Sequence, residues 1–170
     1  MKLRGAVMRS MLIFAAMTIA MILALASAGM AKSDKEFLSD AMKGDNSEIT
    51  LGELATQKGG SEDVRSLGRA LVDDHRKAKD EATALASDLE VKITTTITVE
   101  AQSAVEKLQR KSGPEFDQAF VDYMISNLEK DIAEFKEKAG EGGRPVPEFA
   151  KKMLPVLQKH LQLAQSLSRH

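Results

Sequence analysis

An apolar stripe at helical spacing between residues 64 and 89 constrains the fold more than any other feature of the chain. Its members recur every three or four residues, which places them on one side of an α-helix. One position near the middle is polar, His75, and it follows Asp73 and Asp74. A buried imidazole needs a hydrogen-bonding partner, because burying it alone costs roughly 1–3 kcal/mol. The members of the stripe are Val64, Leu67, Leu71, His75, Ala78, Ala82, Leu85 and Leu89.

The first residues have the pattern of an export signal. A basic start precedes an almost wholly apolar run over residues 11–26, and Ala26-Ser27-Ala28 then supplies the small residues that a signal peptidase reads. We expect residues 1–28 to be a signal peptide that is cleaved after Ala28, with Ala31 as the second candidate. The membrane would then be involved only before cleavage. An uncleaved membrane anchor is the alternative, because the run approaches the ~20 residues that span a bilayer.

The rest of the chain, residues 29–170, is predicted to be one domain exported to the periplasm or cell envelope. Cleavage would remove three basic residues, Lys2, Arg4 and Arg9, and no acidic residue, so the net charge of −1 becomes −4. A mildly acidic chain without a basic patch does not favour nucleic acid as a partner. The sequence has no cysteine, so its stability has to come from packing and not from disulfides.

Capping signals predict a helical hairpin in the first half of this domain. Ser33-Asp34-Lys35-Glu36 has the pattern of a capping box, and the helix that it begins runs to about Lys58. Gly59-Gly60 is expected to end this helix in the left-handed conformation that glycine tolerates. Ser61 is the predicted N-cap of the helix that carries the apolar stripe. A connection this short makes the two helices antiparallel.

The second half is predicted to contain an extended segment, a short helix and a second hairpin. Residues 91–99 are β-branched and alternating, but a lone strand has nothing to pair with, so we interpret them as an extended crossover. A short helix follows to about Arg110, and a long one spans about Glu115 to Ala139. Pro147 suits the first turn of the last helix, where its missing N–H is harmless, and Pro155 is expected to kink that helix.

Two hairpins side by side bring three polar residues to one level. Glu48 lies within the apolar arc of its helix, about one turn closer to the hairpin connection than His75. His160 interrupts the inner stripe of the last helix. Bundles use such convergent carboxylates and imidazoles for metal sites. The residues predict either a mononuclear transition-metal site of Glu48, His75 and His160, with Asp74 as an additional candidate, or histidines that bond each other, Glu48 or a backbone carbonyl.

Several motifs resemble one family of exported bacterial proteins. They are Phe37 with Glu48-x-x-Leu51-Gly52, Leu71-Val72-x-Asp74-His75, Gly113-x-x-Phe116-Asp117-x-x-Phe120-Val121, and Phe149-Ala150 with Leu154-Pro155-x-Leu157-x-x-His160-Leu161. The family is known as domain of unknown function four-one-four-two and is regarded as ferritin-like. The resemblance, from about Lys35 to Leu167, implies an all-α, ferritin-like four-helix bundle. Its two antiparallel hairpins would be joined by the extended crossover and a short extra helix. The resemblance implies no activity.

Two departures, one from the family's histidine pattern and one from the ligand pattern of di-iron proteins, restrict the kind of metal site that the chain can form. Where the family usually has a third histidine, in the long helix after the Phe-Asp motif, this chain has Leu128. The Glu-x-x-His pairs of di-iron proteins are also absent, because Val72 and Leu157 stand three residues before His75 and His160. A di-iron centre needs about four carboxylates with two histidines. A di-iron oxidase is therefore excluded.

The sequence shows none of the residue patterns of the common enzyme classes. It has no nucleophile–base constellation, no glycine-rich phosphate loop and no cysteine, and no motif identifies a small-molecule substrate. The leading hypothesis is a non-enzymatic envelope protein with a role in stress tolerance or surface interactions. The rival hypothesis is a mononuclear metal-binding protein whose metal the sequence does not specify.

Overall fold

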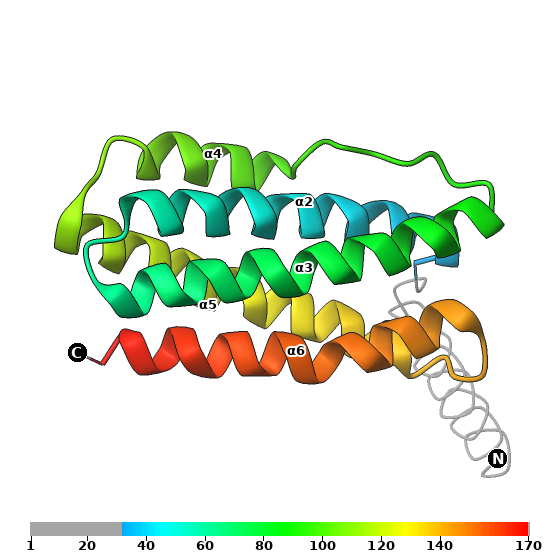
Figure 1. Cartoon of the computed structure of the whole chain (residues 1–170). Helices are drawn as coiled ribbons and strands as arrows, with labels where there is room; N and C mark the ends of the chain where they lie inside the picture. Colours follow the sequence, from blue (N-terminus) through cyan, green and yellow to red (C-terminus); the bar gives the residue numbers. More distant parts are fainter. Residues whose placement is uncertain (1–31, 170) are drawn as a thin grey trace, which may run out of the picture. The chain divides into compact units, whose positions relative to one another are not determined.

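The computed structural model describes residues 32–169, which fold as an all-α bundle (Figure 1). The predicted set of four long helices, one short helix and an extended segment over residues 91–98 is confirmed. The segment assigned to the signal peptide lies outside the described residues. No helix within residues 32–169 is long and apolar enough to cross a membrane. The helices are α2 (Asp34–Lys58), α3 (Glu62–Asp88), α4 (Val99–Leu108), α5 (Gly113–Ala139) and α6 (Pro145–Leu167).

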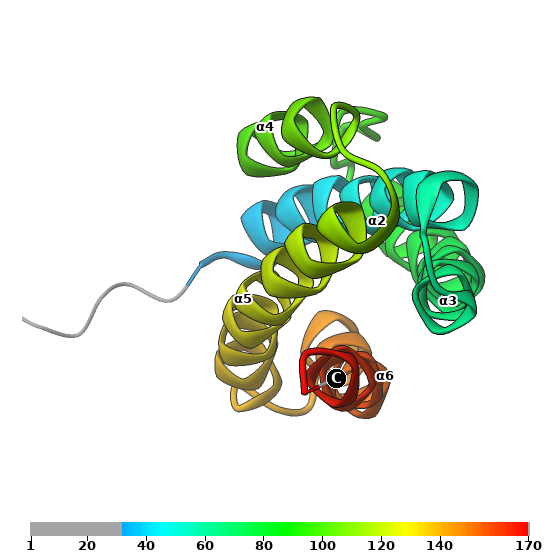
Figure 2. The ribbon, with the colours of Figure 1, turned by 90° about the vertical axis from the view of Figure 1, so that its left-hand side faces the viewer.

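The long helices pair as two hairpins, as predicted. α2 packs along α3, α5 packs along α6, and the hairpins meet mainly where α3 contacts α6 (Figures 1 and 2). The predicted caps are present. Ser33 and Glu36 form the complete capping box of α2, and the Ser61 hydroxyl accepts a hydrogen bond from the backbone N–H of Val64 at the start of α3.

The α2–α3 connection requires glycine for close approach and not for a left-handed backbone. The predicted left-handed stop is wrong, because Gly59 has a φ of −55°. A Cβ on Gly59 would lie 2.7 Å from the carbonyl oxygen of Ala55, and one on Gly60 would lie 2.7 Å from the backbone of Gly113. The Asp117 carboxylate accepts hydrogen bonds of 2.7 Å from the backbone N–H groups of Gly60 and Ser61. This carboxylate ties the α2–α3 turn to the N-terminal part of α5.

The second hairpin differs from the prediction at its helix starts. α6 begins at Pro145, so this proline, and not Pro147, occupies the first helical position. α5 begins at Gly113, whose φ of +57° lies in the left-handed region that favours glycine. α6 continues as a helix through Pro155.

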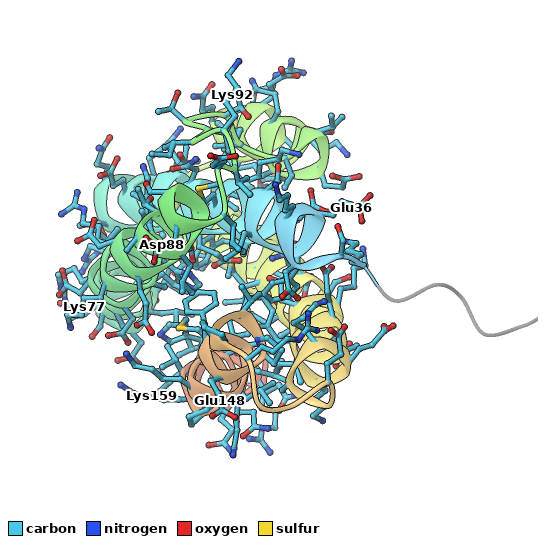
Figure 3. The ribbon with its side chains drawn as sticks, turned by 90° about the vertical axis from the view of Figure 1, so that its right-hand side faces the viewer. Glu36, Lys77, Asp88, Lys92, Glu148 and Lys159 are labelled. Atoms are coloured by element: carbon cyan, nitrogen blue, oxygen red, sulfur yellow. The ribbon has the colours of Figure 1, made fainter. Side chains whose placement is uncertain are left out.

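The core of the bundle is divided into two hydrophobic clusters. One lies toward the α2–α3 turn and includes Leu51, Leu71 and Phe120, and the other lies toward the opposite end and includes Phe37 and Phe149. Between them along α2, residues 45–48 are all buried although all four are polar. By contrast, charged side chains such as Lys77 and Lys159, labelled in Figure 3, point outward from the bundle. The buried polar residues therefore interrupt the core.

The extended segment and α4 cover α2 on the side away from α6 (Figure 2). The Asn46 side-chain amide donates hydrogen bonds of 3.1 Å to the carbonyl oxygens of Thr94 and Thr96. The Ser47 hydroxyl accepts one of 3.0 Å from the backbone N–H of Thr98. Because α2 is covered on both sides, consecutive residues of this helix are buried.

Candidate metal centre

Seven polar side chains from the four long helices lie together between the two hydrophobic clusters. We call this set the polar layer. It contains the three ligands predicted from the sequence, the additional candidate Asp74, and three residues that the sequence analysis missed. Its members are Asp45 and Glu48 of α2, Asp74 and His75 of α3, Asn127 and Asp131 of α5, and His160 of α6.

His75 is held by a carboxylate on one ring nitrogen and is free on the other. The side chain is 3% exposed, and its Nδ1 lies 2.8 Å from Oδ1 of Asp45. Its Nε2 is buried without a hydrogen-bond partner among the described residues. Burial opposes the charged ring, but the bond to Asp45 and the nearby charge of Glu48 outweigh it and raise the pKa of His75. At Asp45, burial disfavours the charged carboxylate and raises its pKa.

His160 has the same arrangement with its ring nitrogens exchanged. Its Nε2 lies 3.1 Å from Oδ2 of Asp74, and its Nδ1 is buried with no partner in the part of the chain that the structure describes. Burial and the neighbouring His75 lower the pKa of His160 to about 4, so this ring is neutral at pH 7. The two ring centroids are 5.5 Å apart. The structure therefore brings the histidines together, but each bonds an aspartate and not the other ring.

Glu48, the third predicted ligand, also has a hydrogen-bond partner at only one of its two carboxylate oxygens. It is 1% exposed. Its Oε1 accepts a hydrogen bond of 2.8 Å from Nδ2 of Asn127, whereas its Oε2 is buried without a partner among the described residues. The same Asn127 nitrogen donates to Oδ2 of Asp131 at 2.8 Å. Burial raises the pKa of Glu48, and burial together with the Glu48 charge raises the pKa of Asp131 to about 7.

The three predicted ligands share one pattern, in which one atom is anchored and the other is free. Histidines that bind metals almost always donate their second ring N–H to a carboxylate or carbonyl. Asp74 is already occupied by His160 and lies 3.6 Å from the ammonium of Lys77, so it serves as an anchor. Within residues 32–169, no three His, Asp or Glu side chains are grouped closely enough to hold a metal ion as they stand. Binding would require these side chains to rotate toward one another.

A cleft of about 610 Å³ gives access to the polar layer. Asp45, Glu48, His75 and Asp131 line it together with the partly exposed Asp40 and Glu134, which flank it nearer the surface. Residues 96–100, from the end of the extended segment and the start of α4, form another wall. The cleft therefore leads to the side chains of Glu48 and His75, whereas their free atoms are buried and His160 does not line it.

The fold and the polar layer define an all-α bundle protein with a buried histidine–carboxylate site. The chain belongs to the family described as Domain of unknown function (DUF4142), whose model matches residues 21–167. The family resemblance seen in the motifs is thereby confirmed.

A search of solved structures adds a likeness in fold. The structure described as "CopM in the Cu(II)-bound form" has a TM-score of 0.71 and 14% sequence identity, and the match covers 82% of this chain and 98% of that chain. At this identity the likeness shows the fold alone. No curated protein matches the sequence.

Proposed function

We propose that this chain is an exported, non-catalytic bundle protein that binds one transition-metal ion in its polar layer, with Glu48, His75 and His160 as ligands. One observation carries the proposal: each of these side chains has one atom anchored by a neighbour and one buried atom without a partner. An unpaired buried polar atom costs about 1–3 kcal/mol. A bound cation would offset that cost at all three atoms at once.

The anchors also prepare the ligands chemically. In the neutral form of His75, Nδ1–H donates to Asp45 and Nε2 presents its lone pair; because the pKa of His75 is raised, metal binding has to displace the proton that Nε2 carries in the charged form. His160 needs no deprotonation at neutral pH because its pKa is about 4. Two imidazole nitrogens with one carboxylate oxygen suit zinc, copper and iron. The structural neighbour described as Cu(II)-bound makes copper the first metal to test.

A second candidate is a metal-free envelope protein in which the polar layer is only a hydrogen-bonded network. The absence of three grouped ligand side chains within residues 32–169 favours it. Such a protein would act in stress tolerance or surface interactions, as the sequence first suggested. The two candidates differ in whether the protein holds a metal ion through His75 and His160.

Metal content distinguishes these candidates. We expect the purified protein, dialysed to equilibrium against Cu(II), Zn(II), Fe(II) or Mn(II), to retain one ion per chain of at least one metal. The His75→Ala/His160→Ala variant should retain little of it, and His75→Gln/His160→Gln supplies a second, more conservative version. His170→Ala, which removes an imidazole at the chain end, is the matched control. Equal metal content in wild type and both double variants would overturn the proposal.

Export is tested separately from metal binding. The basic start, the apolar run and the small residues before position 29 support a cleaved signal peptide. Protein recovered from the periplasm should have the mass of residues 29–170, or of 32–170 if the second candidate site is used. Recovery of the intact chain in the membrane fraction would instead indicate an anchor.

A further inference from the structure

We propose that Asp131 is a fourth ligand of the same ion, so that each long helix of the bundle contributes one ligand. This inference rests on the proposed function and adds a residue that the sequence did not indicate. The complete ligand set would be Glu48 of α2, His75 of α3, Asp131 of α5 and His160 of α6.

The position of Asp131 is the first argument. It lines the same cleft as Glu48 and His75. One nitrogen of Asn127 donates to Oε1 of Glu48 and to Oδ2 of Asp131, at 2.8 Å in each case. The two carboxylate oxygens therefore lie within 5.6 Å of each other, twice the length of one hydrogen bond. For both carboxylates to bind one ion, the two side chains have to rotate toward each other.

Charge is the second argument. Within residues 32–169, no lysine or arginine forms an ion pair with Glu48, Asp45 or Asp131, whereas Lys32 and Lys43 are paired with carboxylates nearer the surface. Carboxylates that share a buried site without a cation repel each other. Asn127 relieves this repulsion only through the NH2 group of its side-chain amide, which carries no net charge. A divalent cation between the two carboxylates would remove it.

Coordination number is the third argument. Two imidazoles and one carboxylate leave one position of a tetrahedral ion open, as in catalytic zinc sites. Adding the Asp131 carboxylate closes the set at four protein ligands. The two carboxylates also match the charge of a divalent ion. A closed site fits a protein that holds an ion and performs no chemistry on it.

The test is a comparison of Asp131→Asn with Glu134→Gln, which removes a carboxylate one turn away in the same cleft. Changes around a metal ligand typically reduce affinity about 10–100-fold, and loss of the ligand itself should cost at least as much. We expect Asp131→Asn to weaken Co(II) and Cu(II) binding about 100-fold and to change the visible spectrum of bound Co(II). Glu134→Gln should leave both nearly unchanged.

The failures of this inference and of the proposed function are distinguishable. If wild type binds no ion, the proposed function fails. If His75→Gln weakens binding but Asp131→Asn behaves like Glu134→Gln, only the role of Asp131 is overturned. Asp131→Glu keeps the carboxylate and should restore part of the affinity with an altered Co(II) spectrum. Should Asp131→Asn not fold, an unchanged Co(II) spectrum in Asp131→Glu would overturn the inference.

Discussion

The interface between α2 and α3 is built in two opposite ways within about two helical turns. At Gly52 and Gly68 the helices touch: a Cβ on either glycine would lie 2.6 Å from the carbonyl oxygen of the other. Seven residues away on both helices, Asp45 of α2 faces His75 of α3, and the same interface holds a carboxylate and an imidazole. The contact between Gly52 and Gly68 leaves no room for side chains between the helices, whereas the contact between Asp45 and His75 buries two polar side chains there.

The difference between these two contacts indicates which part of the α2–α3 interface stabilises the fold. Close backbone contact adds dispersion attraction without burying any polar side chain. The buried Asp45–His75 pair requires both groups to leave water, and replacing such pairs by apolar residues is often neutral or stabilising. Under the proposed function, this pair between two apolar clusters serves the metal site and not the stability of the fold. The predictions below test this contrast in the metal-free protein, with a chelator present.

The largest effect is expected at the polar pair. Asp45→Leu should lower the free energy of unfolding by about 3–5 kcal/mol, because it leaves His75 buried without its partner. Asp45→Leu/His75→Leu should recover most of that loss. Chemical denaturation of the two single variants and the double variant measures the coupling.

An exposed ion pair is the control for that cycle. Arg76 and Glu53 join the same two helices at 2.8 Å but are both exposed, so their coupling should be below about 1 kcal/mol. A coupling energy between Asp45 and His75 no larger than that between Arg76 and Glu53 would contradict the expected cost of leaving one member of the buried pair without its partner.

The next largest effect is expected at the glycine contact. Gly68→Ala should lower the free energy of unfolding by about 1–3 kcal/mol, because the added Cβ meets backbone atoms of α2 that have no room to move. Gly44→Ala in α2 meets nothing within 4 Å and should raise it by about 0.5–1 kcal/mol through helix propensity. Thermal or chemical unfolding of both variants checks the sign of each change, and a stabilising Gly68→Ala would show that the helices do not touch there.

The last effect is expected in the pH dependence of stability. Asp131 has a pKa of about 7 when folded and about 4 when unfolded. Between these values the folded state binds more protons, so this carboxyl destabilises the protein increasingly as pH rises from about 4 to 7. Asp131→Asn should therefore be stabilised relative to wild type at pH 7, and less so at pH 5. A difference that did not depend on pH would contradict the raised pKa of the half-buried Asp131.

The sequence predicted the helices well because their signals are local. The caps at Ser33 and Ser61 and the apolar stripes depend on residues within a few turns, and the hairpins follow from two short connections. Close approach of distant glycines is not local. The expected role of Gly59 was therefore wrong, although its position at the end of α2 was right.

The polar layer could be predicted only in part. His75, His160 and Glu48 interrupt apolar patterns, which is a visible signal. Asp45 was missed because it is one of four consecutive polar residues, and they are all buried because other helices cover α2 on one side and the extended segment and α4 cover it on the other.

The contribution of α5 was missed for a similar reason. Leu128, which stands where the family usually has a third histidine, packs in a hydrophobic cluster. Its neighbour Asn127 and, one turn further, Asp131 face Glu48 instead. A sequence pattern does not distinguish a solvated carboxylate on a helix from one that meets a second helix.

Pulsed electron paramagnetic resonance of the protein loaded with one Cu(II) per chain tests the central claim most directly. The account predicts nitrogen couplings from two imidazoles in wild type and in His170→Ala, and from one imidazole in His75→Gln and in His160→Gln. Wild type without imidazole couplings, or single variants whose couplings match those of wild type, would contradict it.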